Sequence, residues 1–293
     1  MQTTQESTTP PAEFVQITRS ARALLGWMQP QEAEKVQAGG RADVHKPEYV
    51  ERAAHARSVV AARPPGVNQA NLVSDPPEAL QSYITSLEQN PAASQYFQQG
   101  WRVCLADLQK VFALQPSILI DQAVKRTRGV VPDDLSAIAA ISLPLPKPAA
   151  LPLLFDQGRQ SWVLSSANPN LRIIGNWHGE IQPGLTGFGF TVSVLPSFMQ
   201  VARFADRYIL RDGYHRAYGF LRAGVSIVPV LTREFGQFED LGLPPGLLPT
   251  AAYLGERPPL LPDFLDNDVS AEVALPSVQK TIVVAGLELT TFS

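Results

Sequence analysis

The sequence predicts an α+β protein with a helical N-terminal half and a mixed sheet in the C-terminal half. Apolar residues recur with a period near four before residue 142 and near two after residue 155, as expected for helices and strands respectively. Between them, residues 143–154 carry four prolines, which exclude a helix or an interior strand. The predicted parts are a disordered tail (1–12), a mainly helical region (13–142), a proline-rich connector (143–154), an α/β module (155–235) and an extended proline-rich arm with closing strands (236–293).

Composition limits the classes of function. The 293 residues are 45% hydrophobic, enough for one large core or two modest ones, and the net charge of −3 gives no general attraction to nucleic acid. No apolar run approaches the roughly 20 residues that span a bilayer, so no membrane contact is expected, and the chain is predicted to be cytoplasmic. A single cysteine, Cys104, excludes an internal disulfide and a zinc site built on several thiolates, and its apolar neighbours favour a core position.

The N-terminal half is predicted to be mainly helical. Amphipathic or proline-initiated patterns predict helices over Phe14–Met28, Pro47–Ala62 and Glu78–Leu87, the last capped by Ser74 and Asp75. Trp101–Leu105 has the composition of a strand, and Asp133 and Asp134 cap a final helix that ends near Ile141. Lys125, Arg126 and Arg128 form a small basic cluster, read as a solvated face with an anionic partner as the alternative.

After the connector, short strands are expected. They are predicted over 161–165, 171–174, 188–195, 199–204, 269–273 and 281–289, with a turn at 167–170. Gly175–Glu180 is predicted to be a polar and aromatic cluster in a turn at the end of a strand, of the kind that often builds sites on a rigid sheet. The alternative is an ordinary hairpin whose tryptophan packs on the sheet. Asp263, Asp266 and Asp268 do not match the spacing of a calcium loop and are interpreted as a solvated acidic turn.

Arg207–Leu231 is the one stretch whose local pattern suggests chemistry. A strand over Tyr208–Leu210 runs into a turn at Asp212-Gly213, and a helix is predicted from Tyr214 to Ala223. Gly224 ends this helix in a left-handed cap, and Val225–Leu231 is a buried strand, so that the whole suits a βαβ-like unit.

The first turn of this helix is a candidate anion site. Unpaired amides and the positive end of the helix dipole favour a phosphate there. Arg216 can hold two phosphate oxygens, and His215 can donate to a third or move a proton. The alternative is structural: Asp212 is then only a helix cap, Arg216 a surface cation and His215 a satisfied polar residue.

The residues Asp212-Gly213-Tyr214-His215-Arg216, followed by Ala217 and an apolar helix, resemble the signature of the ParB/sulfiredoxin-like superfamily. Members of that group carry a Gly-x-x-Arg turn that holds nucleotide phosphates at a helix N-terminus. The resemblance spans about residues 198–231 and implies a nucleotide-binding α/β module. Tyr214 replaces the sulfiredoxin cysteine and His215 replaces the first arginine of the ParB turn, which removes the thiol chemistry and argues against the DNA clamp.

Two functions follow from the resemblance. The first is binding of ATP or another nucleotide with Mg²⁺, with phosphoryl transfer to a small molecule or protein, or nucleotide hydrolysis. Gly213, Tyr214, His215 and Arg216 would then hold the nucleotide, and Asp212 would be the helix cap or a magnesium ligand. Trp177 would stack on the base or cover the pocket if its loop folds over the turn. The catalytic candidates are His215 and Asp212, with Glu180 and His178 as acid or base if their loop folds over the turn. The second function is a non-catalytic binding or assembly module that contacts a protein partner or further copies of itself.

Overall fold

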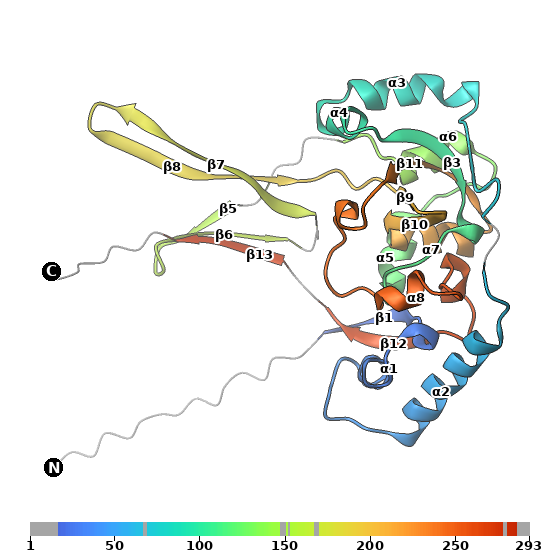
Figure 1. Cartoon of the computed structure of the whole chain (residues 1–293). Coiled ribbons are helices and arrows are strands. Elements are labelled where there is room, and N and C mark those ends of the chain that lie inside the picture. Colours follow the sequence, from blue (N-terminus) through green and yellow to red (C-terminus); the bar gives the residue numbers. More distant parts are fainter. Residues whose placement is uncertain are drawn as a thin grey trace, which may run out of the picture.

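The protein has an α+β fold in which the described strands form four separate sheets (Figure 1). The computed structural model describes residues 17–66, 69–146, 151, 153–166, 170–277 and 280–285. The predicted tail 1–12, the turn residues 167–169, much of the connector and the end of the last strand lie outside these residues.

The helices cluster in the first half of the chain. They are α1 (Pro30–Gln37), α2 (Pro47–Ala62), α3 (Gln81–Gln89), α4 (Pro91–Gln98), α5 (Ile120–Arg126), α6 (Leu135–Ser142), α7 (Tyr214–Arg222) and α8 (Thr250–Tyr253). Short 3₁₀ turns are η1 (Leu25–Trp27), η2 (Glu78–Leu80), η3 (Leu108–Lys110), η4 (Glu239–Leu241) and η5 (Leu261–Phe264). The predicted bounds of α2 are confirmed, and Asp134 caps α6 as expected by accepting a bond from the amide of Ala137.

The strands come from both sides of the connector. They are β1 (Thr18–Ala23), β2 (Val73–Ser74), β3 (Arg102–Asp107), β4 (Ser117–Leu119), β5 (Leu153–Asp156), β6 (Ser161–Ser166), β7 (Leu171–Gln182), β8 (Leu185–Val194), β9 (Gln200–Phe204), β10 (Arg207–Asp212), β11 (Ile227–Phe235), β12 (Ala271–Pro276) and β13 (Lys280–Ala285).

A mixed five-stranded sheet is the centre of the body. Its order is β10-β9-β11-β3-β2, with β9 and β11 parallel and the other neighbours antiparallel. Side chains that alternate along β9 and β11 enter two different apolar clusters, one containing Val201 and Val230 and the other Ala202 and Leu231. Both faces of the sheet are therefore buried, which explains why β11 is an almost continuous apolar run.

The strand–helix–strand unit differs from a simple βαβ crossover. Strands β10 and β11 flank α7 but run antiparallel, because β9 lies between them and pairs antiparallel with β10 and parallel with β11. The parallel pair is thus β9 and β11, and the connection between them includes both β10 and α7.

Three predictions of local structure are wrong, two in the N-terminal half and one in the C-terminal half. The predicted helix over Phe14–Met28 is strand β1 followed by η1, because residues 18–23 pair with β12 on one side and β4 on the other. Ser74 and Asp75 do not cap the next helix; Ser74 lies in β2 and η2 has no side-chain cap. The predicted turn at Gly175–Glu180 is the middle of β7, since each of its residues pairs with β8.

Two small sheets lie outside this body. One is the β7–β8 hairpin, called the hairpin arm below (residues 171–194), and the other has the order β13-β6-β5. Figure 1 shows both on the left of the view, away from the five-stranded sheet and the helices. Within the described part of the chain, no helix is long and apolar enough to cross a membrane.

Candidate functional site

The turn between β10 and α7 requires glycine. Gly213 is the N-cap residue of α7 and has φ 103°, a backbone conformation that residues with a Cβ rarely adopt. A Cβ at this position would lie 2.5 Å from Cγ of Met199. The predicted tight turn is confirmed, with Gly213 rather than Asp212 in the cap position.

Arg216 points into the protein. It is 3% exposed, and Nη1 donates to the carbonyls of Ile141 and Ser142, each at 3.2 Å, and of Ser197 at 2.5 Å. Nη2 donates to Oγ of Ser197 at 2.8 Å. The guanidinium thus satisfies carbonyls that the C-terminal turn of α6 leaves without helical partners, and it joins α6 and the segment before β9 to α7.

Burial changes the ionisation of Arg216 only moderately. Desolvation lowers its pKa to about 10, with the nearby Asp212 carboxylate opposing this shift. The side chain therefore stays charged at neutral pH. Its Nε is buried and has no hydrogen-bond partner among the described residues.

Asp212 lies among arginines. Burial raises the pKa of its carboxyl, whereas Arg216, the amide of Gly213, Arg126 and Arg211 each act to lower it. Mg²⁺ prefers oxygen ligands and retains several waters, so a largely desolvated carboxylate in the positive field of Arg216, Arg126 and Arg211 does not fit a magnesium site. This arrangement instead neutralises charge inside the protein.

His215 faces α5. Its Nε2 is buried and finds no partner among the described residues. Desolvation, together with the charges of Arg126 and Arg19, lowers its pKa to about 4, while Asp121 acts in the opposite direction. The imidazole is neutral at pH 7, so this environment does not favour proton transfer by His215 near neutrality.

Tyr214 is a structural residue of the turn. Its hydroxyl accepts a bond from the amide of Leu114 at 2.8 Å and donates to the carbonyl of Leu210. Burial raises the pKa of the phenol. The hydroxyl thereby joins the segment before β4 to the end of β10. The Tyr214 side chain is buried, with 6% of its surface exposed.

The other predicted site residues lie on the hairpin arm and do not meet this turn. Trp177, His178 and Glu180 belong to β7, which Figure 1 places outside the body that contains α7. Glu180 accepts a bond from the amide of Gly184 at 3.1 Å and so stabilises the hairpin turn. The structure therefore brings Asp212, Gly213, Tyr214, His215 and Arg216 together but separates them from the three residues of β7.

The glycines of β8 have a packing role. A Cβ on Gly189 would lie 2.8 Å from Nε1 of Trp177, and a Cβ on Gly187 would lie 3.1 Å from the same indole and 2.6 Å from Ile181. The indole thus lies across the backbone of β8 on one face of the hairpin. The absence of side chains at these two positions makes room for it.

A groove between α5 and α7 has a volume of about 660 Å³. Its floor is formed where Gly219 meets Thr127, whose Oγ1 would lie 2.4 Å from a Cβ on that glycine. Lys125, Arg128 and Arg222 line it. Asp121 also lines the groove but is paired with Arg19, and none of the three cations forms an ion pair with a described residue, so the groove carries a net positive charge.

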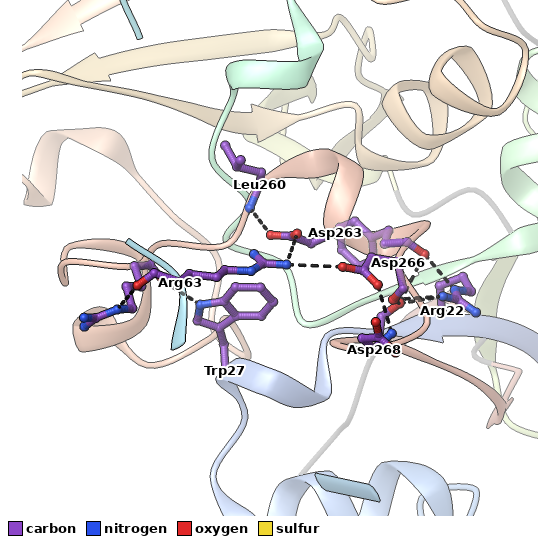
Figure 2. Close-up of polar contacts among 10 residues, drawn as sticks. Arg22, Trp27, Arg63, Leu260, Asp263, Asp266 and Asp268 are labelled. Atoms are coloured by element: carbon purple, nitrogen blue, oxygen red, sulfur yellow. Dashed lines mark hydrogen bonds and ion pairs between the residues drawn. The ribbon is translucent and has the colours of Figure 1, made fainter. Parts of the chain in front are cut away.

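A second polar cluster, shown in Figure 2, holds the C-terminal segment against the N-terminal half. Arg63 donates to Asp263 at 2.9 Å and to Asp266 at 3.3 Å, and its guanidinium lies 5.3 Å from the centre of the Trp27 ring. Arg22 is 8% exposed and donates to the carbonyl of Phe264 at 2.7 Å. The prediction of a solvated acidic turn is wrong for Asp263, because it is buried and ion-paired.

The groups of this cluster bind one another. Asp263 also accepts a bond from the amide of Leu260 at 2.7 Å, and Asp266 accepts one from the amide of Asp268 at 2.9 Å. The residues that the structure describes contain no group of three or more metal-ligating side chains. The cluster is therefore a structural clasp.

Two further sequence assignments concern single residues. Asp107 caps η3 by accepting a bond from the amide of Gln109 at 3.1 Å, and Cys104 is a buried core residue of β3 whose thiol pKa is raised by burial. Neither belongs to a site.

The hairpin arm carries an exposed apolar surface that was not expected from the sequence. Seven large side chains of the hairpin arm are between 46% and 79% exposed. They are Ile173, Ile174, Trp177, Ile181, Leu185, Phe188 and Phe190. The available signal was the sequence of β8, LTGFGFTVSV, which is β-prone and has no charged residue.

Comparison of the chain with protein-family models, curated proteins and solved structures found no match. The likeness to the ParB/sulfiredoxin-like superfamily therefore rests on the residues of the α7 turn, and it stays a prediction.

Proposed function

We propose that this chain is a protein-interaction and assembly module that works through its hairpin arm. The observation that carries the proposal is the exposure of large apolar side chains on a two-stranded sheet. An isolated two-stranded hairpin is only marginally stable in water, and a partner that packs on it supplies the missing contacts.

The size of the apolar surface supports this proposal. An aromatic side chain buries about 150 to 250 Å², so seven large side chains that are about half exposed present on the order of 600 Å². The largest apolar patch on an ordinary monomer is about 300 to 600 Å² and is often functional. Trp177 lies on the face opposite to Phe188 and Phe190, so this area is divided between the two faces, and each face of the 24-residue arm presents a patch near the lower end of that range.

The α7 turn supports a structural role better than a catalytic one. Arg216 is bonded to backbone carbonyls, Tyr214 to the backbone on both sides of its hydroxyl, and His215 is neutral. These residues position α6, β9, β10 and α7 with respect to one another. They keep the body rigid, and a rigid body is a suitable base for a projecting arm.

A photo-reactive phenylalanine analogue at Phe188 tests the proposal in cells that express the chain. Phe188 is 79% exposed, and we expect a cross-linked product of one defined mass that disappears when Phe190→Lys is also present. The matched control carries the analogue at Val131, which is 53% exposed on the body. If Phe188 gives no more product than Val131, the proposed function is wrong.

Nucleotide binding is the second candidate, and the groove between α5 and α7 is the observation that favours it. Its volume lies within the range of about 300 to 1,000 Å³ that is usual for ligand sites, and its three unpaired cations suit phosphates. Calorimetric titration with ATP, CTP and GTP, each with Mg²⁺, tests it. Lys125→Gln/Arg222→Gln should weaken binding about a hundredfold or more, because each of the two lost charge-assisted bonds contributes about 1.5 to 3 kcal/mol.

The choice of variant matters in that titration. Arg216→Ala removes internal bonds and therefore affects folding as well as any ligand. The groove variants leave those bonds in place. Absence of heat with all three nucleotides in the wild-type protein would exclude this candidate.

A further inference from the structure

The two edges of the hairpin arm differ in their protection against strand pairing. Strand β7 has a bulge at each end, at Ile174 and Ile181, and it carries Arg172 and Glu180. Bulges and charged side chains are devices by which edge strands avoid pairing with another chain. The β7 edge is therefore poorly suited to accept a further strand.

Strand β8 has neither device. Its ten residues contain no charged side chain and no proline, and both register shifts of the hairpin lie on β7. Within the described residues, β8 pairs only with β7, so its other edge presents backbone amides and carbonyls that are available to a new strand. An unprotected edge of this length is a site for β-strand addition.

We infer that β8 pairs antiparallel with β8 of a second copy of this chain, giving a four-stranded sheet that crosses the dimer axis. This inference rests on the proposed assembly function and names the partner. A strand without charge offers no pattern of charges by which a protein of different sequence would be selected. It also meets no like-charge repulsion when it faces itself across a two-fold axis, the commonest symmetry of oligomers.

The side chains of β8 fit such an axis at Gly189. Antiparallel pairing about this residue places Phe188 of each copy opposite Phe190 of the other, and aromatic pairs across strands are stabilising. Phe188 and Phe190 share one face of the hairpin, since His178 and Asn176 are their partners on β7. Glycine at the axis leaves the opposite face to the Trp177 side chains of the two copies.

Pairing along β8 brings the apolar side chains of that strand beside those of the second copy. Leu185, Phe188 and Phe190 lie on β8, whereas the exposed apolar side chains of β7 lie one strand farther from the axis. The interface therefore consists of the paired backbone edges and the contacts between Phe188 and Phe190.

Sedimentation and light scattering of the purified full chain test the inference. We expect the wild-type protein to have twice the mass of a single chain. Phe190→Lys should convert it to a monomer, because the substitution puts two cations at neighbouring positions of the paired strands. Asn176→Lys is the matched control, since Asn176 lies opposite Phe190 on the same face but on β7, and it should remain dimeric.

Disulfide trapping gives the register. In Thr186→Cys/Val192→Cys, the thiol at position 186 of one copy should face the thiol at position 192 of the other. Opposite Cα atoms in an antiparallel pair are about 4.5 to 5.5 Å apart, which permits a disulfide. The two positions lie about 20 Å apart along one strand, so they cannot bond within a chain. Cys104, the single native cysteine, is buried, so a covalent dimer reports the new pair.

These experiments test the identity of the partner separately from the proposed assembly function. A wild-type monomer, a dimer that Phe190→Lys leaves intact, or failure to trap a covalent dimer overturns the pairing of β8 with itself. If the photo-cross-link at Phe188 then joins the chain to a different protein, the assembly function stands and only the identity of the partner is wrong. If Phe188 also gives no specific product, both fail.

Discussion

Acid lability caused by His215 is a quantitative consequence of its burial. The folded protein holds this imidazole with a pKa of about 4, against 6.5 for the exposed side chain. Between pH 6.5 and 4 the unfolded chain therefore binds a proton that the folded protein does not. The free energy of unfolding must fall as the pH is lowered through this range, and above pH 6.5 the contribution is constant.

The size of this effect follows from the shift. Each pKa unit corresponds to about 1.4 kcal/mol, so a shift of about 2.5 units makes the protein about 3 kcal/mol less stable at pH 4 than at pH 7 through this residue alone. In His215→Gln the side chain does not titrate, and this contribution is absent. The difference in unfolding free energy between the two proteins should therefore change by about 3 kcal/mol over that range.

Urea unfolding followed by circular dichroism at pH 7, 6, 5 and 4 measures this difference, since all other titrating groups are common to both proteins. Arg126→Gln offers a second check. Arg126 is the charge that most strongly lowers the pKa of His215, so its removal should reduce the loss of stability at low pH. A difference between wild type and His215→Gln that stays constant from pH 7 to 4 would refute the reasoning.

Two further predictions concern the turn and the clasp. Gly213→Ala should lower the free energy of unfolding by about 2 to 5 kcal/mol, because it adds backbone strain and a close contact with Met199. Gly224 also has a positive φ, of 78°, but has open space around it, so Gly224→Ala should lower the free energy of unfolding by only about 1 to 2 kcal/mol. Thermal unfolding of the two variants compares them, and equal losses would contradict the role of the contact. Arg63→Met leaves the buried Asp263 carboxylate without its ion pair and should lose about 2 to 4 kcal/mol in urea unfolding. Adding Asp263→Asn should restore most of this stability, because a neutral amide needs no counter-charge; no recovery would show that the clasp acts through packing instead.

The local sequence was sufficient for features that depend on neighbouring residues. The bounds of α2, the glycine turn before α7 and the left-handed cap at Gly224 were predicted because proline and glycine restrict or permit backbone angles regardless of the rest of the chain. The α+β class was predicted for a similar reason, since the period of apolar residues reports which local structure can bury them.

Features that depend on distant partners were decided by the tertiary structure. Residues 18–23 have a helical pattern but form β1, because β12 and β4 provide hydrogen bonds on both edges. Arg216 occupies the predicted position at the start of α7, yet its direction is determined by the carbonyls of α6, which is 74 residues away in the chain. Spacing alone cannot distinguish a guanidinium that faces a ligand from one that faces the protein interior.

The hairpin arm also combines features that depend on the local sequence with features that depend on the tertiary structure. The sequence alone determined that β8 is β-prone and uncharged, and that glycine alternates with phenylalanine along it. Only the tertiary structure decided that residues 175–180 pair with β8 instead of folding over α7, that Trp177 covers Gly187 and Gly189, and that the phenylalanines remain exposed. Exposure is a property of the whole arrangement, because it depends on which segments of the chain come close enough to exclude water.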